Sequence, residues 1–106
     1  MKHVLQFSNP VFHGGLNVTV RNGDKWMKAN IGDHLEIKET GSPVVRLTGT
    51  LIGKACLPLT MVPEAWLINE HDPSCRTYVG LLKEMERVYP EFSAENNTVT
   101  VLLFTL

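Results

Sequence analysis

The sequence has few of the residues that mark a disulfide scaffold, a metal cluster or a membrane segment. Two cysteines and four histidines are scattered along the chain, and none stands at the paired spacing of a zinc site. No apolar run approaches the roughly 20 residues that a membrane-spanning helix needs, and no apolar leader follows the first residues. We therefore expect a cytoplasmic protein with free thiols and without metal, cofactor or membrane contact.

A strong charge of one sign is also missing. The formal net charge is -1 at pH 7, which is unlike the overall basic charge of many nucleic-acid-binding proteins. The two halves differ: residues 1–54 carry seven Lys and Arg against four Asp and Glu, and residues 55–106 carry three against seven. This split is consistent with a local basic patch for an anion, or with two solvated faces that attract each other.

What remains is an ordinary globular composition. With 106 residues, 43% of them hydrophobic and 20% charged, the chain has room for one domain, residues 1–106, with a core of its own. It holds no nucleophile elbow, phosphate-binding loop or dinucleotide fingerprint. Any chemistry must therefore come from smaller groups of residues.

Alternation of apolar and polar residues predicts a β-sheet. The longest predicted strand contains Gly49 and Gly53, which are unusual inside a strand and indicate bulges or bends where a sheet curls. The last predicted strand is too apolar to be an exposed edge. The predicted strands are residues 4–7, 16–21, 34–38, 44–57 and 97–106.

Two helices are expected between the fourth and fifth strands. The first begins near Pro63 and Glu64, and the second begins with Asp72 as N-cap and Pro73 at the first helical position. An apolar face follows at helical spacing: Tyr78, Leu81, Leu82, Met85 and Val88. The order of elements predicts an α+β fold, a small curled or barrel-like mixed β-sheet with two helices packed at one side.

The strand at residues 16–21 is the first candidate site. Its polar face presents Asn17, Thr19 and Arg21 in a row. A guanidinium offers fixed donors to a carboxylate, a phosphate or a base edge, and an amide both donates and accepts, which suits a nucleobase. Alternatively, this face is simply solvated, or Arg21 pairs with Asp24 or Asp33.

The second candidate is the segment Lys25-Trp26-Met27-Lys28. An aromatic side chain between lysines is typical of surfaces that stack a base and contact its phosphate. Lys25, Trp26 and Lys28 are therefore candidate ligand-binding residues. The alternative is a Trp-Met pair that fills the core, with the lysines outside.

The third candidate is Glu70-His71-Asp72, between the two predicted helices. Two carboxylates beside an imidazole can act as general acid and base if they face a cleft. The alternative is a polar turn in which Asp72 caps the next helix. Cys75 follows shortly after and is either a thiol activated near a helix start or one packed in the core.

Several of these motifs, in this order and spacing, carry a resemblance to a known family. They are Phe7, then Gly14-Gly15-x-x-Val18-Thr19-Val20-Arg21, then Gly32-Asp33-x-Leu35-x-Ile37, then a helix that ends in Val88-Tyr89-Pro90. Over nearly its whole length the chain resembles an ASCH domain of the PUA-like superfamily, and most closely the small bacterial 4-acetylcytidine amidohydrolases.

The resemblance implies a β-barrel with a cleft beside the strand at residues 16–21, used for RNA, nucleotides or modified nucleosides. In the amidohydrolases a lysine, a threonine and a downstream glutamate are catalytic. The threonine position corresponds to Thr19, and Glu70 is the nearest candidate for the glutamate. The lysine position is occupied by Leu16.

Three functions stay open at this point. One is a catalytically divergent module that binds RNA or a nucleotide through Asn17, Thr19, Arg21 and the Lys25–Lys28 segment. Another is an amidohydrolase of an acylated cytidine-type nucleoside, with Thr19 and Glu70 as catalytic residues. The last is a protein-interaction module that has lost the ligand.

Overall fold

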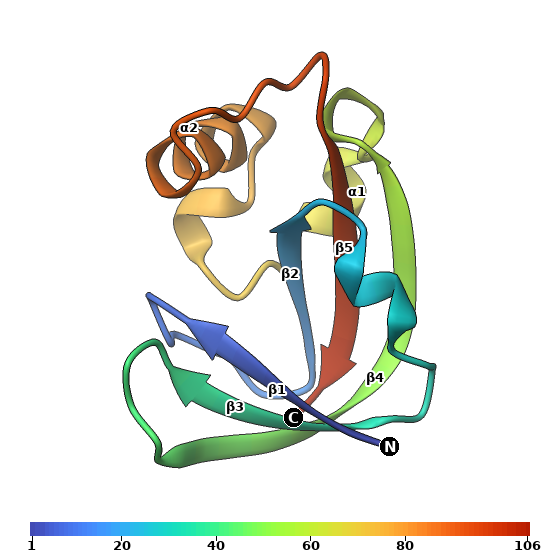
Figure 1. Ribbon diagram of the computed structural model, residues 1–106, viewed down its shortest axis with the longest axis vertical. Helices are drawn as coiled ribbons and strands as arrows, with labels where there is room; N and C mark the ends of the chain where they lie inside the picture. Colours follow the sequence, from blue (N-terminus) through green and yellow to red (C-terminus); the bar gives the residue numbers. More distant parts are fainter.

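One five-stranded mixed sheet forms most of the structure, a computed structural model that describes residues 1–106 (Figure 1). The strands are β1 (Lys2–Phe7), β2 (Leu16–Asn22), β3 (His34–Glu39), β4 (Val45–Pro58) and β5 (Thr98–Thr105). The helices are α1 (Glu64–Leu67) and α2 (Tyr78–Val88), with the 3-10 turns η1 (Lys25–Lys28), η2 (Leu59–Met61) and η3 (Pro73–Cys75). The predicted α+β class is confirmed.

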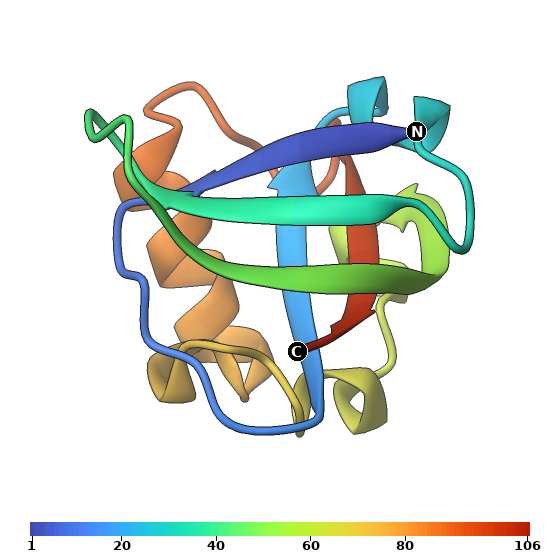
Figure 2. The same cartoon turned by 90° about the horizontal axis from the view of Figure 1, so that it is seen from below.

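The sheet curls on itself but stays open. Its strand order is β1-β3-β4-β5-β2, with β1 parallel to β3 and all other neighbours antiparallel. The long strand β4 pairs first with β3 and then with β5, so the two ends of the sheet cross each other (Figure 2). The edge strands β1 and β2 do not pair. The closed barrel that the resemblance implies is therefore wrong, because no backbone ladder joins the two edges.

The curl begins where the glycines of β4 lie. The register with β5 shifts between Leu51 and Gly53, which confirms the predicted bulge. At Gly49 a Cβ atom would collide with the backbone oxygen of Thr105, so only glycine lets the two strands approach this closely.

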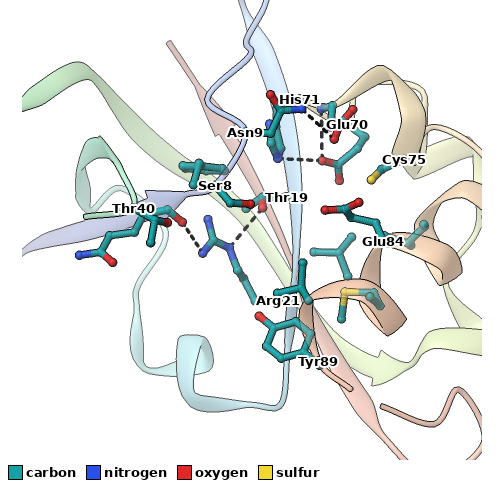
Figure 3. A pocket seen from close by; sticks show the side chains of 17 residues that line it. Ser8, Asn9, Thr19, Arg21, Thr40, Glu70, His71, Cys75, Glu84 and Tyr89 are labelled. Atoms are coloured by element: carbon teal, nitrogen blue, oxygen red, sulfur yellow. Dashed lines mark hydrogen bonds and ion pairs between the residues drawn. The ribbon is translucent and has the colours of Figure 1, made fainter. Parts of the chain in front are cut away.

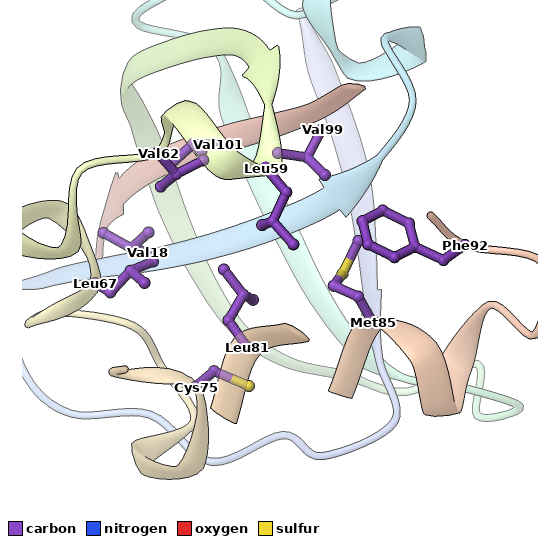
Figure 4. Close-up of a cluster of buried hydrophobic side chains, with 10 residues drawn as sticks. All are labelled: Val18, Leu59, Val62, Leu67, Cys75, Leu81, Met85, Phe92, Val99 and Val101. Atoms are coloured by element: carbon purple, nitrogen blue, oxygen red, sulfur yellow. The ribbon is translucent and has the colours of Figure 1, made fainter. Parts of the chain in front are cut away.

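Strand β5 is buried on both faces, since each face packs into a different core. Val99 and Val101 belong to a first core that also contains the buried side chains of α1 and α2 (Figure 4). Leu102 and Phe104 point the other way, into a second core with β1 and β3. Burial on both sides explains the apolar run at residues 101–104, and β5 lies inside the sheet, as predicted.

The second helix starts later than the sequence suggests. Asp72 accepts a hydrogen bond from Ser74 N–H and caps the short turn η3, whereas the side chain of Thr77 accepts from Gly80 N–H and caps α2. The predicted start at Pro73 is wrong because a second cap, Thr77, follows the first by five residues. The apolar face was predicted correctly, and its Leu81 and Met85 are buried. Neither α-helix is long and apolar enough to cross a membrane.

Candidate functional site

A pocket of about 350 Å³ opens between the two unpaired edge strands and helix α2 (Figure 3). Strand β1 contributes its last residues, β2 contributes Thr19, Val20 and Arg21, and α2 forms the opposite wall. Further polar lining comes from the loop after β1, from the residue after β3 and from the segment before η3: Ser8, Asn9, Thr40, Glu70, His71 and Asp72. The pocket therefore lies where the sheet fails to close.

The segment before η3 is fixed to the free edge of β2. Val18 N–H donates to the Asn69 carbonyl over 2.8 Å, and His71 N–H donates to the Val18 carbonyl over 2.9 Å. Glu70 lies between these two bonds, and its side chain reaches the same pocket as that of Thr19. Backbone pairing thus brings together two residues that are far apart in the sequence.

Arg21 spans the gap between the two edge strands. Its Nη1 donates to the Gln6 carbonyl of β1 over 2.8 Å, and its Nε donates to Thr19 Oγ1 over 3.2 Å. The guanidinium carbon lies 4.4 Å from the centre of the Phe7 ring, a cation–π contact. Burial lowers the pKa of Arg21 from its ordinary value, but a guanidinium stays charged in a protein.

Glu70 is the most deeply buried carboxyl group in the pocket, with 2% of its surface exposed. Its Oε1 lies 3.1 Å from His71 Nε2 and accepts from Asp72 N–H over 3.4 Å, while its Oε2 has no hydrogen-bond partner. Burial raises the pKa of Glu70 to about 8, against the hydrogen bond from Asp72 N–H, which lowers it, and with a smaller rise from the Asp72 carboxylate. At neutral pH this side chain is therefore mostly protonated.

The ring of His71 fixes where that proton lies. His71 Nδ1 is 3.1 Å from the Val11 carbonyl, which only accepts, so Nδ1 carries the hydrogen. Burial lowers the pKa of His71 to about 4, so the ring is neutral and Nε2 offers a lone pair to Glu70 Oε1. The carboxyl proton thus sits on Oε1, and Oε2 is left as an acceptor without a donor.

The other ionisable groups of the pocket are engaged or inert. Although burial raises it, the pKa of Asp72 falls below its ordinary value because Ser74 N–H, Asn9 and the Ser74 hydroxyl donate to the carboxylate. Burial raises the pKa of Cys75 to about 12, so its thiol stays protonated and packs in the first core. No group of three or more His, Cys, Asp or Glu side chains is arranged to hold a metal ion.

The structure brings six of the candidate residues to this pocket: Thr19, Arg21, Glu70, His71, Asp72 and Cys75. Asn17, on the same strand, is fully buried and directed into the turn before β2. Its Nδ2 donates to the His13 carbonyl over 2.7 Å, and its Oδ1 accepts from His13 N–H over 3.3 Å. Asn17 therefore does not line the pocket.

The predicted segment Lys25–Lys28 forms turn η1 outside the pocket. Trp26 packs against the second core, with its ring edge-on to His3 at 6.1 Å, and Lys28 lies 5.6 Å from the Trp26 ring centre. Lys25 is exposed. None of the three lines the pocket.

Sequence reasoning missed several pocket residues. Phe7, Ser8 and Tyr89 line it, and the strand and helix patterns give no sign that they share a site. Leu16, at the position where the resemblance implies a lysine, is not among the lining residues, and no lysine lines the pocket.

Comparisons with family models, curated proteins and solved structures find no match to this chain. The resemblance to ASCH domains therefore remains a prediction from the motifs.

Proposed function

We propose that the protein binds a nucleotide or nucleoside, either free or as part of a short RNA segment, in the pocket between β1, β2 and α2. The main support is a set of unsatisfied polar groups in the residues that line this pocket: the buried Glu70 Oε2 has no donor, and two donors have no acceptor. Thr19 accepts from Arg21, so its own hydroxyl hydrogen is free, and Arg21 Nη2 has no partner in the protein. A ligand that donates to Glu70 Oε2 and accepts from Thr19 and Arg21 would satisfy all of these groups.

Size and walls agree with such a ligand. A volume of about 350 Å³ lies at the small end of the range for ligand pockets. The rings of Phe7 and Tyr89 and the side chains of Leu81 and Met85 supply apolar surface for a flat heterocycle. Because Lys25 and Lys28 lie elsewhere, one nucleotide unit fits the site better than a long phosphate backbone does.

Titration followed by amide NMR tests this proposal. Ribonucleosides, their 5′-monophosphates and short single-stranded RNA are added at low salt, and we expect shifts at Thr19, Glu70 and Tyr89. Thr19→Val removes the free hydroxyl and should weaken binding about tenfold, whereas Lys25→Ala should change nothing. Absence of binding, or shifts confined to η1, would contradict the proposal.

A second candidate function is hydrolysis of an acylated nucleoside, favoured by the raised pKa of Glu70 in the same pocket as Thr19. Glu70 Oε2 takes a proton from the attacking water while the Oε1 proton moves to His71 Nε2. Thr19 and Arg21 donate to the oxygen that becomes negative. When the C–N bond breaks, the proton passes to the leaving amine, and the acyl group leaves as a carboxylic acid.

Incubation with 4-acetylcytidine, read by chromatography, decides between binding alone and hydrolysis. If the protein is an enzyme, cytidine appears. Glu70→Gln then lowers the rate of cytidine formation by at least about a hundredfold, because the amide cannot relay the proton. Cytidine formation that is unaffected by Glu70→Gln and Thr19→Val would exclude this mechanism. Binding without cytidine formation would exclude hydrolysis and support only the binding proposal.

A further inference from the structure

Arg21 is a half-buried cation without a counter-ion in the protein. The six ion pairs of the structure do not include it, and its three contacts, with Thr19 Oγ1, the Gln6 carbonyl and the Phe7 ring, are all with neutral groups. A charge removed from water without an opposite charge is unfavourable unless a ligand supplies one.

The carboxyl groups that share the pocket are all engaged elsewhere. Glu70 holds its proton against His71, and Asp72 accepts from Asn9 and Ser74. Glu84, on α2, forms an ion pair with Arg87. None of them approaches Arg21 closely enough to form an ion pair, so the guanidinium keeps a net positive charge at this end of the pocket.

Hydroxyl groups surround the same end. Ser8 and Thr40 line the pocket beside the Arg21 guanidinium (Figure 3), and neither side-chain hydroxyl has a hydrogen-bond partner in the protein. Together with Arg21 Nη2 they form a set of free donors around a cation. Guanidinium and hydroxyl donors of this kind suit the oxygens of a phosphate group.

We infer that the ligand carries a phosphate group that pairs with Arg21 at the β1 end of the pocket, so that the pocket selects nucleoside monophosphates over nucleosides. This inference rests on the proposed function and adds the charge of the ligand to it. The base occupies the end near Glu70, and the phosphate occupies the end near Ser8 and Thr40.

Calorimetric titration with the four ribonucleosides and their 5′-monophosphates tests the inference. We expect each monophosphate that binds to do so at least about tenfold more tightly than its nucleoside. Arg21→Met should reduce the difference to twofold or less, and Arg21→Lys should keep part of it. Arg46→Met, which removes an exposed arginine of β4 outside the pocket, is the matched control and should leave the difference unchanged.

A second measurement keeps the test valid if Arg21→Met does not fold. The Nε–H signal of Arg21 in the unmodified protein is followed by NMR while inorganic phosphate is added, and we expect it to shift. Equal binding of nucleosides and monophosphates would overturn the inference and leave the proposed function intact. A shift with phosphate, but no binding of any nucleoside or nucleotide, would retain the anion site and reject the proposed function. No response to any probe would reject both.

Discussion

The molecule contains two buried pairs of a carboxyl group and an imidazole, and they are in opposite states. In the first, His3 Nε2 lies 2.8 Å from Asp33 Oδ2, next to the second core. In the second, His71 Nε2 lies 3.1 Å from Glu70 Oε1, in the pocket. The pKa of Asp33 is lowered to about 2, whereas that of Glu70 is raised to about 8.

Burial dominates the pKa of Glu70, whereas hydrogen-bond donors dominate the pKa of Asp33. Asp33 accepts a backbone hydrogen bond from Asn30, which contributes most to its lowered pKa, and further bonds from His3 and the Met1 ammonium group. Glu70 Oε2 accepts none. The Asp33 carboxylate accepts from three donors and holds the fold together, whereas Glu70 keeps one oxygen without a donor at the pocket.

Asp33→Asn should produce the largest loss of stability, because it removes the charge and one acceptor from a fully bonded group. The lowered pKa means that Asp33 stabilises the fold above its ordinary value of 3.8 and that this contribution disappears as the pH falls through about 2. Urea denaturation at pH 7 and pH 3 measures this contribution. The free energy of unfolding of the variant should fall further below that of the unmodified protein at pH 7 than at pH 3. The exposed Asp24→Asn, whose side chain makes no capping bond, is the control.

Glu70→Gln should instead increase the stability of the fold at alkaline pH. Because the folded pKa of about 8 lies above the ordinary 4.5, the folded protein keeps a proton that the unfolded chain releases, and stability falls as the pH rises between these values. The pKa of His71 is lowered from 6.5 to about 4, so this residue makes stability rise with pH, but only below pH 6.5.

Between pH 6.5 and 8 only Glu70 of this pair changes the pH dependence of stability. The free energy of unfolding of the unmodified protein should therefore fall by up to about 2 kcal/mol over this range. Glu70→Gln should remove this loss, since its amide donates to His71 Nε2 and carries no titrating proton. Urea denaturation across this range measures the slope, with the exposed Glu95→Gln as control. An unchanged slope in Glu70→Gln would show that the carboxyl group is already ionised.

The smallest effect is spectroscopic and involves no change in stability. Nitrogen-15 NMR of the His71 ring at pH 7 should show a protonated Nδ1 and an unprotonated Nε2, because Nδ1–H donates to the Val11 carbonyl. The ring should stay neutral down to about pH 4. The exposed His34 provides the reference spectrum. A proton on Nε2 at pH 7 would contradict the placement of the Glu70 proton on Oε1.

Much of the fold follows from local patterns. Alternation located all five strands to within two residues, the glycines of β4 indicated its bulge, and helical spacing identified Leu81 and Met85 as the inner face of α2. These features depend on neighbours in the chain, which the sequence shows directly. That the sheet stays open does not follow from local patterns, because closure depends on whether the distant strands β1 and β2 pair with each other.

The candidate site was predictable only in part, for the same reason. The polar row on β2 indicated Thr19 and Arg21, but it did not distinguish them from Asn17, whose donor reaches the His13 carbonyl within the preceding turn. Glu70 was named as a candidate, yet its position beside Thr19 depends on backbone bonds to Val18 that no side-chain pattern reveals. Trp26 follows a sequence pattern for stacking, but its packing against the second core keeps it away from the pocket.

The bond between Arg21 and β1 has a consequence for the evolution of such a chain. Its acceptor is the main-chain carbonyl of Gln6, which every amino acid provides. Residue 6 is therefore free to vary while the bond persists, and substitutions at positions 6 and 21 need not be correlated. A contact that joins the two edges of the sheet would leave no covariation signal between related sequences, although loss of the arginine itself would remove it at once.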